Sequence, residues 1–249
     1  MAEVSRRLAE AAPAPAGLDR RGETRLVDQV MDRVAAHIRR HNLLPGAILP
    51  SEAAFAAEFG VSRAVVREAF RSLSALKLID VGAGRRARVS GMDASVLGVV
   101  VEHAVRCDQI TIHQIYDVRR TVETRTAALA ALRRNEAEAE EIAGLAAAMR
   151  RDFCEAERVM EHDIAFHEAI SRACRNPMFG LIVASFGAVT RQTWRVGWTA
   201  RPDDGARMQS VAGHEEIAAA IFAQDPRRAE RAMAEHFDHS VRALLMAGV

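Results

Sequence analysis

The sequence predicts a mainly α-helical protein built from two domains. Its first part, residues 20–91, contains three helical patterns followed by two short strand patterns around a glycine-rich turn. Its second part, residues 92–249, contains helical patterns only, separated by proline and glycine breaks. With 249 residues, of which 49% are hydrophobic, the chain is long enough for two cores of modest size. Residues 1–19 are rich in alanine and proline, and we expect a disordered tail there.

Three helices and a hairpin are predicted in the first domain. From residue 24 to residue 41 the apolar side chains recur every four positions, which is typical of an amphipathic helix. Residues 53–59 and 62–77 give a second and a third helix, and residues 78–81 and 88–90 give the two strands. The apolar stripe of the first helix consists of Leu26, Val30, Val34 and Ile38.

Capping residues mark the ends of the second and third helices. Ser51 precedes the second helix and Ser62 opens the third, and serine is a preferred N-cap residue. Gly60 stands where helices commonly end in the left-handed conformation. The turn over residues 60–62 is as tight as the connection of a helix-turn-helix. Together with the hairpin, these helices predict a winged helix-turn-helix domain in which the third helix is the recognition helix.

The second domain is predicted to be an antiparallel helical bundle. Seven helical stretches are joined by short connections, with breaks at Asn176-Pro177, residues 201–205 and Asp225-Pro226. The stretches are residues 93–106, 111–132, 135–150, 153–174, 177–197, 207–223 and 226–246.

Charge and composition narrow the class of protein. Residues 1–91 carry 15 Lys+Arg against 10 Asp+Glu, whereas the remainder carries 19 against 23. A basic domain joined to an acidic one suggests a module that binds a polyanion.

The three cysteines share no metal-binding or redox spacing, which fits a reducing compartment. No apolar run approaches the roughly 18–20 residues that cross a bilayer, so we expect a cytoplasmic protein with no membrane partner.

The start of the third helix is a candidate DNA-reading surface. Arg63 and Arg67 lie four positions apart and therefore on one face of the helix. Arginine donates two hydrogen bonds to O6 and N7 of guanine, and a helix N-terminus favours phosphate. Arg85 or Arg86, at the tip of the hairpin, would contact the DNA backbone or minor groove. The alternative is that these arginines are solvated surface residues.

These segments resemble the GntR family of bacterial transcription regulators. The resemblance rests on GAILPSE (46–52), FGVSR (59–63), VREA (66–69) and LKLI (76–79). The chain departs from the pattern at Ala64 and Val65, where relatives often have threonine, and at Ala53, where some have an arginine that contacts DNA. The arginines at the hairpin tip would compensate. The residues expected to bind DNA are Ser51, Ser62, Arg63, Arg67, Gly84 and Arg85.

Four residues of the second domain are candidate metal ligands. Asp163 and His167 are spaced i, i+4, so both side chains project from one face of a helix. His214 and His236 lie at equal distances from the turn at Asp225, which would place them level with each other in an antiparallel hairpin. Three imidazoles and a carboxylate suit zinc, nickel or another divalent transition metal. The alternative is a set of core histidines satisfied by hydrogen bonds.

The second domain resembles the FCD effector domain of the FadR subfamily, in its metal-binding branch. The resemblance covers about residues 93–246 and rests on DIAFH (163–167), NP (176–177), HEEI (214–217) and MAEH (233–236). It implies that Asp163, His167, His214 and His236 hold one divalent metal, with zinc and nickel the first candidates.

The same resemblance implies a carboxylate-binding arginine early in the domain. The segment DVRRTVE (117–123) places Arg119 there, pointing inward with Glu123 one turn away. An arginine beside a metal suits a small carboxylate, such as a sugar acid or another hydroxy-acid. Arg191, Trp194 and Arg195 lie on the helix expected to border this cavity, although a half-exposed surface role fits them equally well.

The sequence therefore predicts a homodimeric repressor, not an enzyme, that binds operator DNA and responds to a small carboxylate effector. Two alternatives remain open at this point. One is a metal-dependent, hydrolase-like enzyme, because three histidines and an aspartate can activate water. The other is a regulator without a metal, in which acyl chains fill the helical bundle.

Overall fold

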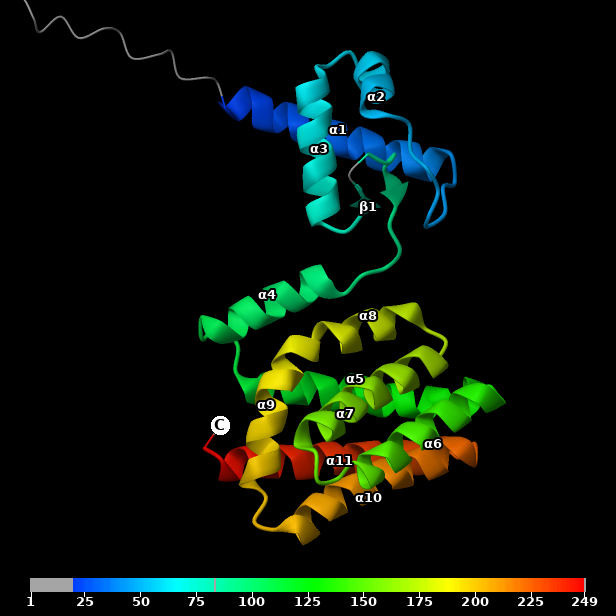
Figure 1. Cartoon of the computed structure of the whole chain (residues 1–249), viewed down its shortest axis with the longest axis vertical. Helices are drawn as coiled ribbons and strands as arrows, with labels where there is room; N and C mark the ends of the chain where they lie inside the picture. The colour runs from blue at the N-terminus through cyan, green and yellow to red at the C-terminus, as the bar shows by residue number, and fades with distance from the viewer. Residues whose placement is uncertain (1–19, 83, 249) are drawn as a thin grey trace, which may run out of the picture. The chain divides into compact units, whose positions relative to one another are not determined.

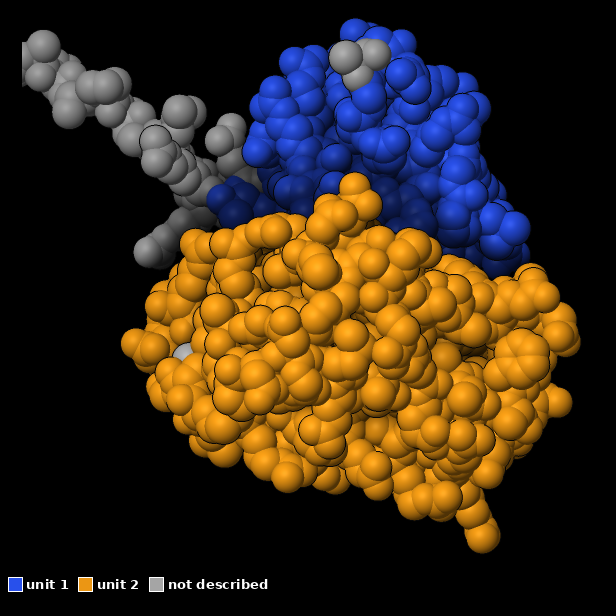
Figure 2. Space-filling model, turned by 60° about the horizontal axis from the view of Figure 1, so that its bottom comes forward, with its two compact units in different colours: residues 1–92 blue, residues 93–249 orange. Residues whose placement is uncertain are grey.

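The computed structural model describes residues 20–82 and 84–248, and the predicted N-terminal tail lies outside them. The chain divides into two compact units, residues 1–92 and residues 93–249, which are coloured separately in Figure 2. Within the described residues, no helix is long and apolar enough to cross a membrane.

Over its described residues, the first unit contains three helices and a two-stranded antiparallel hairpin (Figure 1). In the hairpin, Ile79 pairs with Val89 and Asp80 with Arg88. The predicted stripe of the first helix supplies the core, since Val30 and Val34 are buried against residues of the other two helices. The elements are α1 (Arg20–Arg40), α2 (Glu52–Phe59), α3 (Arg63–Ala75), β1 (Ile79–Asp80) and β2 (Arg88–Val89).

Local side-chain chemistry fixes the start of α2 and the turn between α2 and α3. The Ser51 hydroxyl accepts a hydrogen bond from the Ala54 N–H at 3.1 Å, and the Ser62 hydroxyl accepts one from the Val65 N–H at 3.3 Å. Gly60 ends α2 with φ of 70°, a conformation that costs glycine no steric strain. The predicted helix-turn-helix is therefore confirmed together with its caps.

The second unit is an all-α bundle of eight helices over the described residues (Figure 1). The long helix α5 packs against α11 and α7, and α10 packs against α11 and α6, so that these five helices pack around the middle of the bundle. The mainly α fold predicted from the sequence is confirmed. The helices are α4 (Ser95–Arg106), α5 (Ile112–Arg133), α6 (Glu136–Arg151), α7 (Ala156–Ala173), α8 (Pro177–Ser185), α9 (Gly187–Ala200), α10 (Asp204–Phe222) and α11 (Pro226–Met246).

One predicted helix was wrong: the stretch 177–197 is two helices, α8 and α9. The break between the two helices is at Phe186, which stands between Ser185 and Gly187. Helix α4 packs against both α8 and α9. A Cβ placed on Gly98 of α4 would lie 3.2 Å from the Ser185 carbonyl oxygen, so the two backbones approach closely at the bend. The bend gives α9 a direction that the helical periodicity of 177–197 did not indicate.

Candidate functional site

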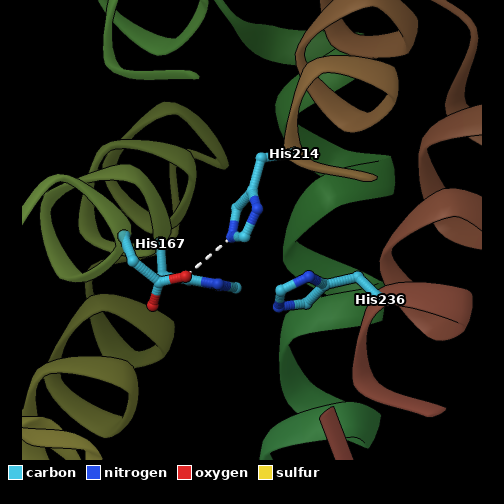
Figure 3. Close-up of side chains that lie close together, drawn as sticks. His167, His214 and His236 are labelled. Carbon is cyan, nitrogen blue, oxygen red and sulfur yellow. Dashed lines mark ion pairs between the residues drawn. The ribbon is translucent and has the colours of Figure 1, made fainter. Parts of the chain in front are cut away.

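Asp163, His167, His214 and His236 form a single cluster in the second unit. Each offers one ligand atom, and these atoms all lie within 4.8 Å of one another. The rings of His214 and His236 have centroids 4.4 Å apart, and those of His167 and His236 5.2 Å apart. Figure 3 shows the three labelled imidazoles turned toward one another from different helices. The equal spacing of His214 and His236 from the α10–α11 turn thus brings them together as expected.

Hydrogen bonds outside the cluster fix the orientation of two of these rings. His214 Nδ1 lies 2.9 Å from the Ser210 carbonyl oxygen, to which it donates, so Nε2 faces inward, 2.7 Å from Asp163 Oδ1. His167 Nδ1 lies against the Glu123 carboxylate. Metal-binding histidines characteristically donate their second ring N–H to a carbonyl or carboxylate in this way. Glu123 as the partner of His167 is a feature that sequence reasoning missed.

The buried polar atoms of the cluster fit a metal ion. Asp163, His167 and His214 are each at most 7% exposed. Among the described residues, His167 Nε2 has no hydrogen-bond partner. A buried ring nitrogen without a partner is uncommon unless water or a ligand satisfies it. Three imidazole nitrogens and a carboxylate are also the donor set that zinc and neighbouring transition metals favour.

Electrostatics holds Asp163 and His236, two residues of the cluster, in the protonation states that bind cations. Burial alone would raise the pKa of Asp163, but the hydrogen bond from His214 and the electrostatic interactions with the surrounding imidazoles lower it well below its ordinary value. Burial, together with His214 and His167, lowers the pKa of His236 well below 6.5. Asp163 is therefore ionised and His236 neutral at neutral pH, as metal coordination requires.

The cluster lines a cavity of about 40 Å³, called the inner cavity below, which Arg119 also lines. Arg119 is 5% exposed, so the predicted inward orientation is confirmed. Its Nε donates to Glu123 Oε1 at 2.8 Å, and its Nη1 donates to Thr190 Oγ1 at 3.0 Å. Burial alone would raise the pKa of Glu123, but the charges of Arg119 and His167 hold it below its ordinary value. Glu123 thus connects the arginine to the cluster.

Of the three predicted effector residues on α9, one lines the inner cavity and two do not. Trp194 lines the inner cavity, whereas Arg191 and Arg195 do not. Both arginines are exposed, and each pairs with a glutamate of α7, Arg191 with Glu161 at 2.7 Å and Arg195 with Glu157. The expectation that the two arginines border the cavity was wrong, because the α9 residues that line the cavity lie on a different face of the helix. The residues of this face are Thr190, Thr193, Trp194, Gly197 and Trp198.

Arg201 is a cavity residue that sequence reasoning missed. It follows α9 and lines the inner cavity, although the sequence suggested only a helix break at that position. A signal was nevertheless present in the sequence. Arg201 continues the stripe of Thr190, Trp194 and Gly197 at helical spacing.

The predicted DNA-binding residues lie on the surface of the first unit. Arg63 begins α3 and is exposed, and Arg67 is exposed and lies 3.4 Å from Glu52 Oε2. Gly84 has φ of 70°, which makes it suited to the hairpin tip. Arg85 is exposed beside it.

Other polar groups of this surface have structural contacts. Arg86 donates to the Leu49 carbonyl oxygen at 2.9 Å, so it helps hold the loop before α2 and leaves Arg85 as the free cation of the tip among the described residues. Ser51 and Ser62 accept backbone hydrogen bonds as helix caps, and their hydroxyl protons can still be donated to phosphate.

Two family models match the chain. The model of the bacterial regulatory proteins of the gntR family matches residues 26–89, and the FCD domain model matches residues 114–239, just over half of the chain. The chain belongs to the GntR family. The first match covers the winged helix-turn-helix, and the second contains Arg119 and all four residues of the cluster.

Curated relatives of this GntR-family chain are transcription regulators. The galactonate operon transcriptional repressor of Escherichia coli is 29% identical, over 87% of this chain and 96% of the relative. The transcriptional regulator LutR of Bacillus subtilis is 28% identical, over 80% of this chain and 92% of the relative. The solved structure of Streptococcus agalactiae GntR has a TM-score of 0.63 at 24% identity and covers 87% of this chain and 98% of that one.

Family membership settles the broad activity. The protein is a DNA-binding transcription regulator with an effector domain, and the enzyme alternative is set aside because the family and the relatives are regulators. The buried cluster therefore lies in the part of a regulator that the FCD domain model matches.

Proposed function

We propose that the protein is a repressor whose affinity for operator DNA is controlled by a small hydroxy-carboxylate bound in the inner cavity beside a divalent metal. The observation that carries this proposal is the presence of Arg119 and the four-residue cluster in one cavity. The names of two relatives support the repressor role, since one controls a galactonate operon and another is the repressor NanR.

The metal would be held by Asp163, His167, His214 and His236, with zinc and nickel as the first candidates. When bound, it would supply a Lewis-acidic centre for oxygen atoms of an acid. The chain's own contribution is orientation: Ser210 fixes the ring of His214, and Glu123 fixes that of His167. Arg119 is fixed in turn by Glu123 and Thr190, so the recognition groups are preorganised.

Arg119 would recognise the carboxylate. Its Nε and Nη1 have partners, and no hydrogen bond engages Nη2 in the described part of the chain. The aromatic rings of Tyr116 and Phe237 lie 5.4 and 5.1 Å from the centre of the guanidinium group and limit its exposure to water. A charged hydrogen bond to a carboxylate is strong in such surroundings.

Binding of the acid would lower operator affinity through a coupling free energy between the two units. We expect the protein to act as a homodimer in the cytoplasm, because a two-fold dimer matches two operator half-sites. A metal-free, acyl-sensing regulator is the weaker alternative. Its cavity would need an apolar lining, whereas this one contains two arginines, an aspartate and three histidines.

Two measurements on one preparation test the proposal. Elemental analysis of protein purified without a histidine tag or chelator should find about one divalent metal per chain. A gel-shift titration with operator DNA should then show release by a sugar acid only when the metal is present. Protein that lacks metal, or operator binding that no hydroxy-acid of a broad panel alters, would contradict the proposal.

The DNA-binding surface gives a separate prediction. Arg63→Ala should weaken specific operator binding by about 1–3 kcal/mol, because a bidentate contact to guanine is lost. Arg71→Ala is the matched control, since Arg71 lies on the same helix, is exposed and pairs with Glu68 at 3.3 Å. Gel-shift titration of both variants at one salt concentration is the measurement. Equal operator affinity for Arg63→Ala and wild type would show that Arg63 makes no specific contact with the operator bases.

A further inference from the structure

A second and larger cavity adjoins the inner cavity. It has a volume of about 420 Å³ and is called the outer cavity below. Several of its lining residues are exposed, among them Gln209, His239 and Arg242, so it opens to solvent. Arg201, Ser210 and His236 line both cavities. The two cavities are therefore neighbours across these three side chains.

The inner cavity is too small for a whole sugar acid. A volume of about 40 Å³ holds roughly three water-sized groups, enough for a carboxylate and an adjacent hydroxyl but not for a six-carbon chain. If Arg119 and the metal take the acid end, the remaining carbon chain has to extend past the shared residues into the outer cavity. Arg201 would then contact the distal part of the ligand.

Arg201 is a cation without a carboxylate partner. Its Nη1 donates to the Gly197 carbonyl oxygen at 2.7 Å, and its Nη2 donates to Ser210 Oγ at 3.0 Å. Both acceptors are neutral, and among the described residues no carboxylate lies within ion-pair distance of the guanidinium group. Burial lowers the pKa of Arg201, yet arginine stays charged at neutral pH. A partly buried cation held this way is poorly compensated.

The charges around the inner cavity balance only before a metal binds. Arg119 and Arg201 carry two positive charges, and Asp163 and Glu123 carry two negative ones. A divalent metal therefore leaves two positive charges in excess. A ligand with one carboxylate neutralises half of this excess, and a ligand with two neutralises all of it.

The outer cavity also favours an anion. Its lining includes the cation Arg242 as well as Arg201. It also includes the carboxylates Glu216 and Glu235, and Glu216 is already neutralised by Arg228, with contacts of 2.6 and 2.7 Å. Among the described residues, Glu235 has no ion pair, so two arginines of this lining stand against one uncompensated carboxylate.

We propose that Arg201 is a second anion-binding residue, and that the effector is a hydroxy-acid with an acidic group at each end. Its first carboxylate binds at Arg119 in the inner cavity, and its second binds at Arg201 where the two cavities meet. This inference rests on the proposed function, since it specifies the class of acid that the same receptor recognises.

Matched pairs of acids test the inference. Gluconate and glucarate share one carbon chain and differ in the second carboxylate, as do galactonate and galactarate. Calorimetry with the full-length, metal-loaded protein should show that the diacid of at least one pair binds ten or more times more tightly than its monoacid. Arg201→Gln should abolish this preference, with the affinity for the diacid falling at least tenfold and that for the monoacid changing less than threefold.

Arg195→Gln is the matched control, because Arg195 lies on α9 and lines neither cavity. It should retain the wild-type preference. Monoacids that bind wild type as tightly as the diacids would overturn the inference while leaving the proposed function standing, and this comparison needs no variant to fold. An equal loss of both acids in Arg201→Gln would also overturn it. If no acid of either pair binds but another hydroxy-acid of a broad panel does, this inference fails and the proposed function stands; if no hydroxy-acid of the panel binds, both fail.

Discussion

His236→Ala should remove the bound metal and lower the melting temperature of the protein by about 10 °C. A ligand that binds only the folded chain, at a thousand times its Kd, adds about 4 kcal/mol of stability. In a protein of this size each kcal/mol corresponds to roughly 2–4 °C. His236 offers a neutral imidazole to the cluster, and its loss leaves only Asp163, His167 and His214 as ligands. Elemental analysis and thermal unfolding in the same buffer are the measurements.

His239→Ala is the control for this experiment. His239 lies on the same helix α11 but is exposed, and its Nδ1 contacts the Glu235 carbonyl oxygen at 2.7 Å. This variant should keep its metal and unfold within a few degrees of wild type. Chelator-treated wild type provides a second comparison, since it loses the ion without losing a side chain. If chelation leaves the melting temperature unchanged, the cluster is a structural group of core histidines.

Two simple geometric rules made the four residues candidates, and the resemblance to the FCD domain selected them as one set. Asp163 and His167 share a helix, and the i, i+4 spacing places them on one face. His214 and His236 lie on neighbouring helices joined by a short turn, and their equal distance from it brings them level. The capping serines of the first unit were also predictable, because an N-cap depends on residues no more than three positions away.

The cavity wall formed by α9 could not be predicted in the same way. Its inward face carries Thr190 and Thr193, which are buried polar residues, so the stripe does not stand out by hydrophobicity. The bend at Ser185 to Gly187 also separates α9 from the helix that precedes it in sequence. The sequence therefore indicated Arg191 and Arg195, whereas Arg201 is the arginine at this wall that lines the cavity.

The contact between Glu123 and His167 was missed for a different reason. Glu123 lies on α5 and His167 on α7, and sequence spacing gives no register between two helices that α6 separates along the chain. The pairing of Glu123 with Arg119, one turn away on the same helix, was predicted and is confirmed. A local partner can be found by periodicity, but a partner from another helix depends on packing.

Arg119→Lys should give a repressor that binds its operator with wild-type affinity but no longer responds to its acid. Lysine keeps a positive charge beside Glu123, which is 1% exposed and would otherwise be left with the His167 imidazole as its remaining partner. A single ammonium cannot contact Glu123, Thr190 and a ligand with the planar geometry of guanidinium. We expect the affinity for the acid to fall by about 10- to 100-fold, corresponding to about 1.4–3 kcal/mol for a charged hydrogen bond.

Lysine is a more informative substitution than alanine at this position. Arg119→Ala would leave a buried carboxylate without its main counter-charge, and breaking a buried ion pair commonly costs about 3–5 kcal/mol. That loss of stability would obscure a loss of recognition. Arg195→Lys is the control, because Arg195 is an exposed arginine outside the inner cavity. Calorimetry with the acid and gel shifts with operator DNA separate the two functions. Wild-type affinity for the acid in Arg119→Lys would mean that the metal or Arg201 binds the carboxylate without the Arg119 guanidinium group.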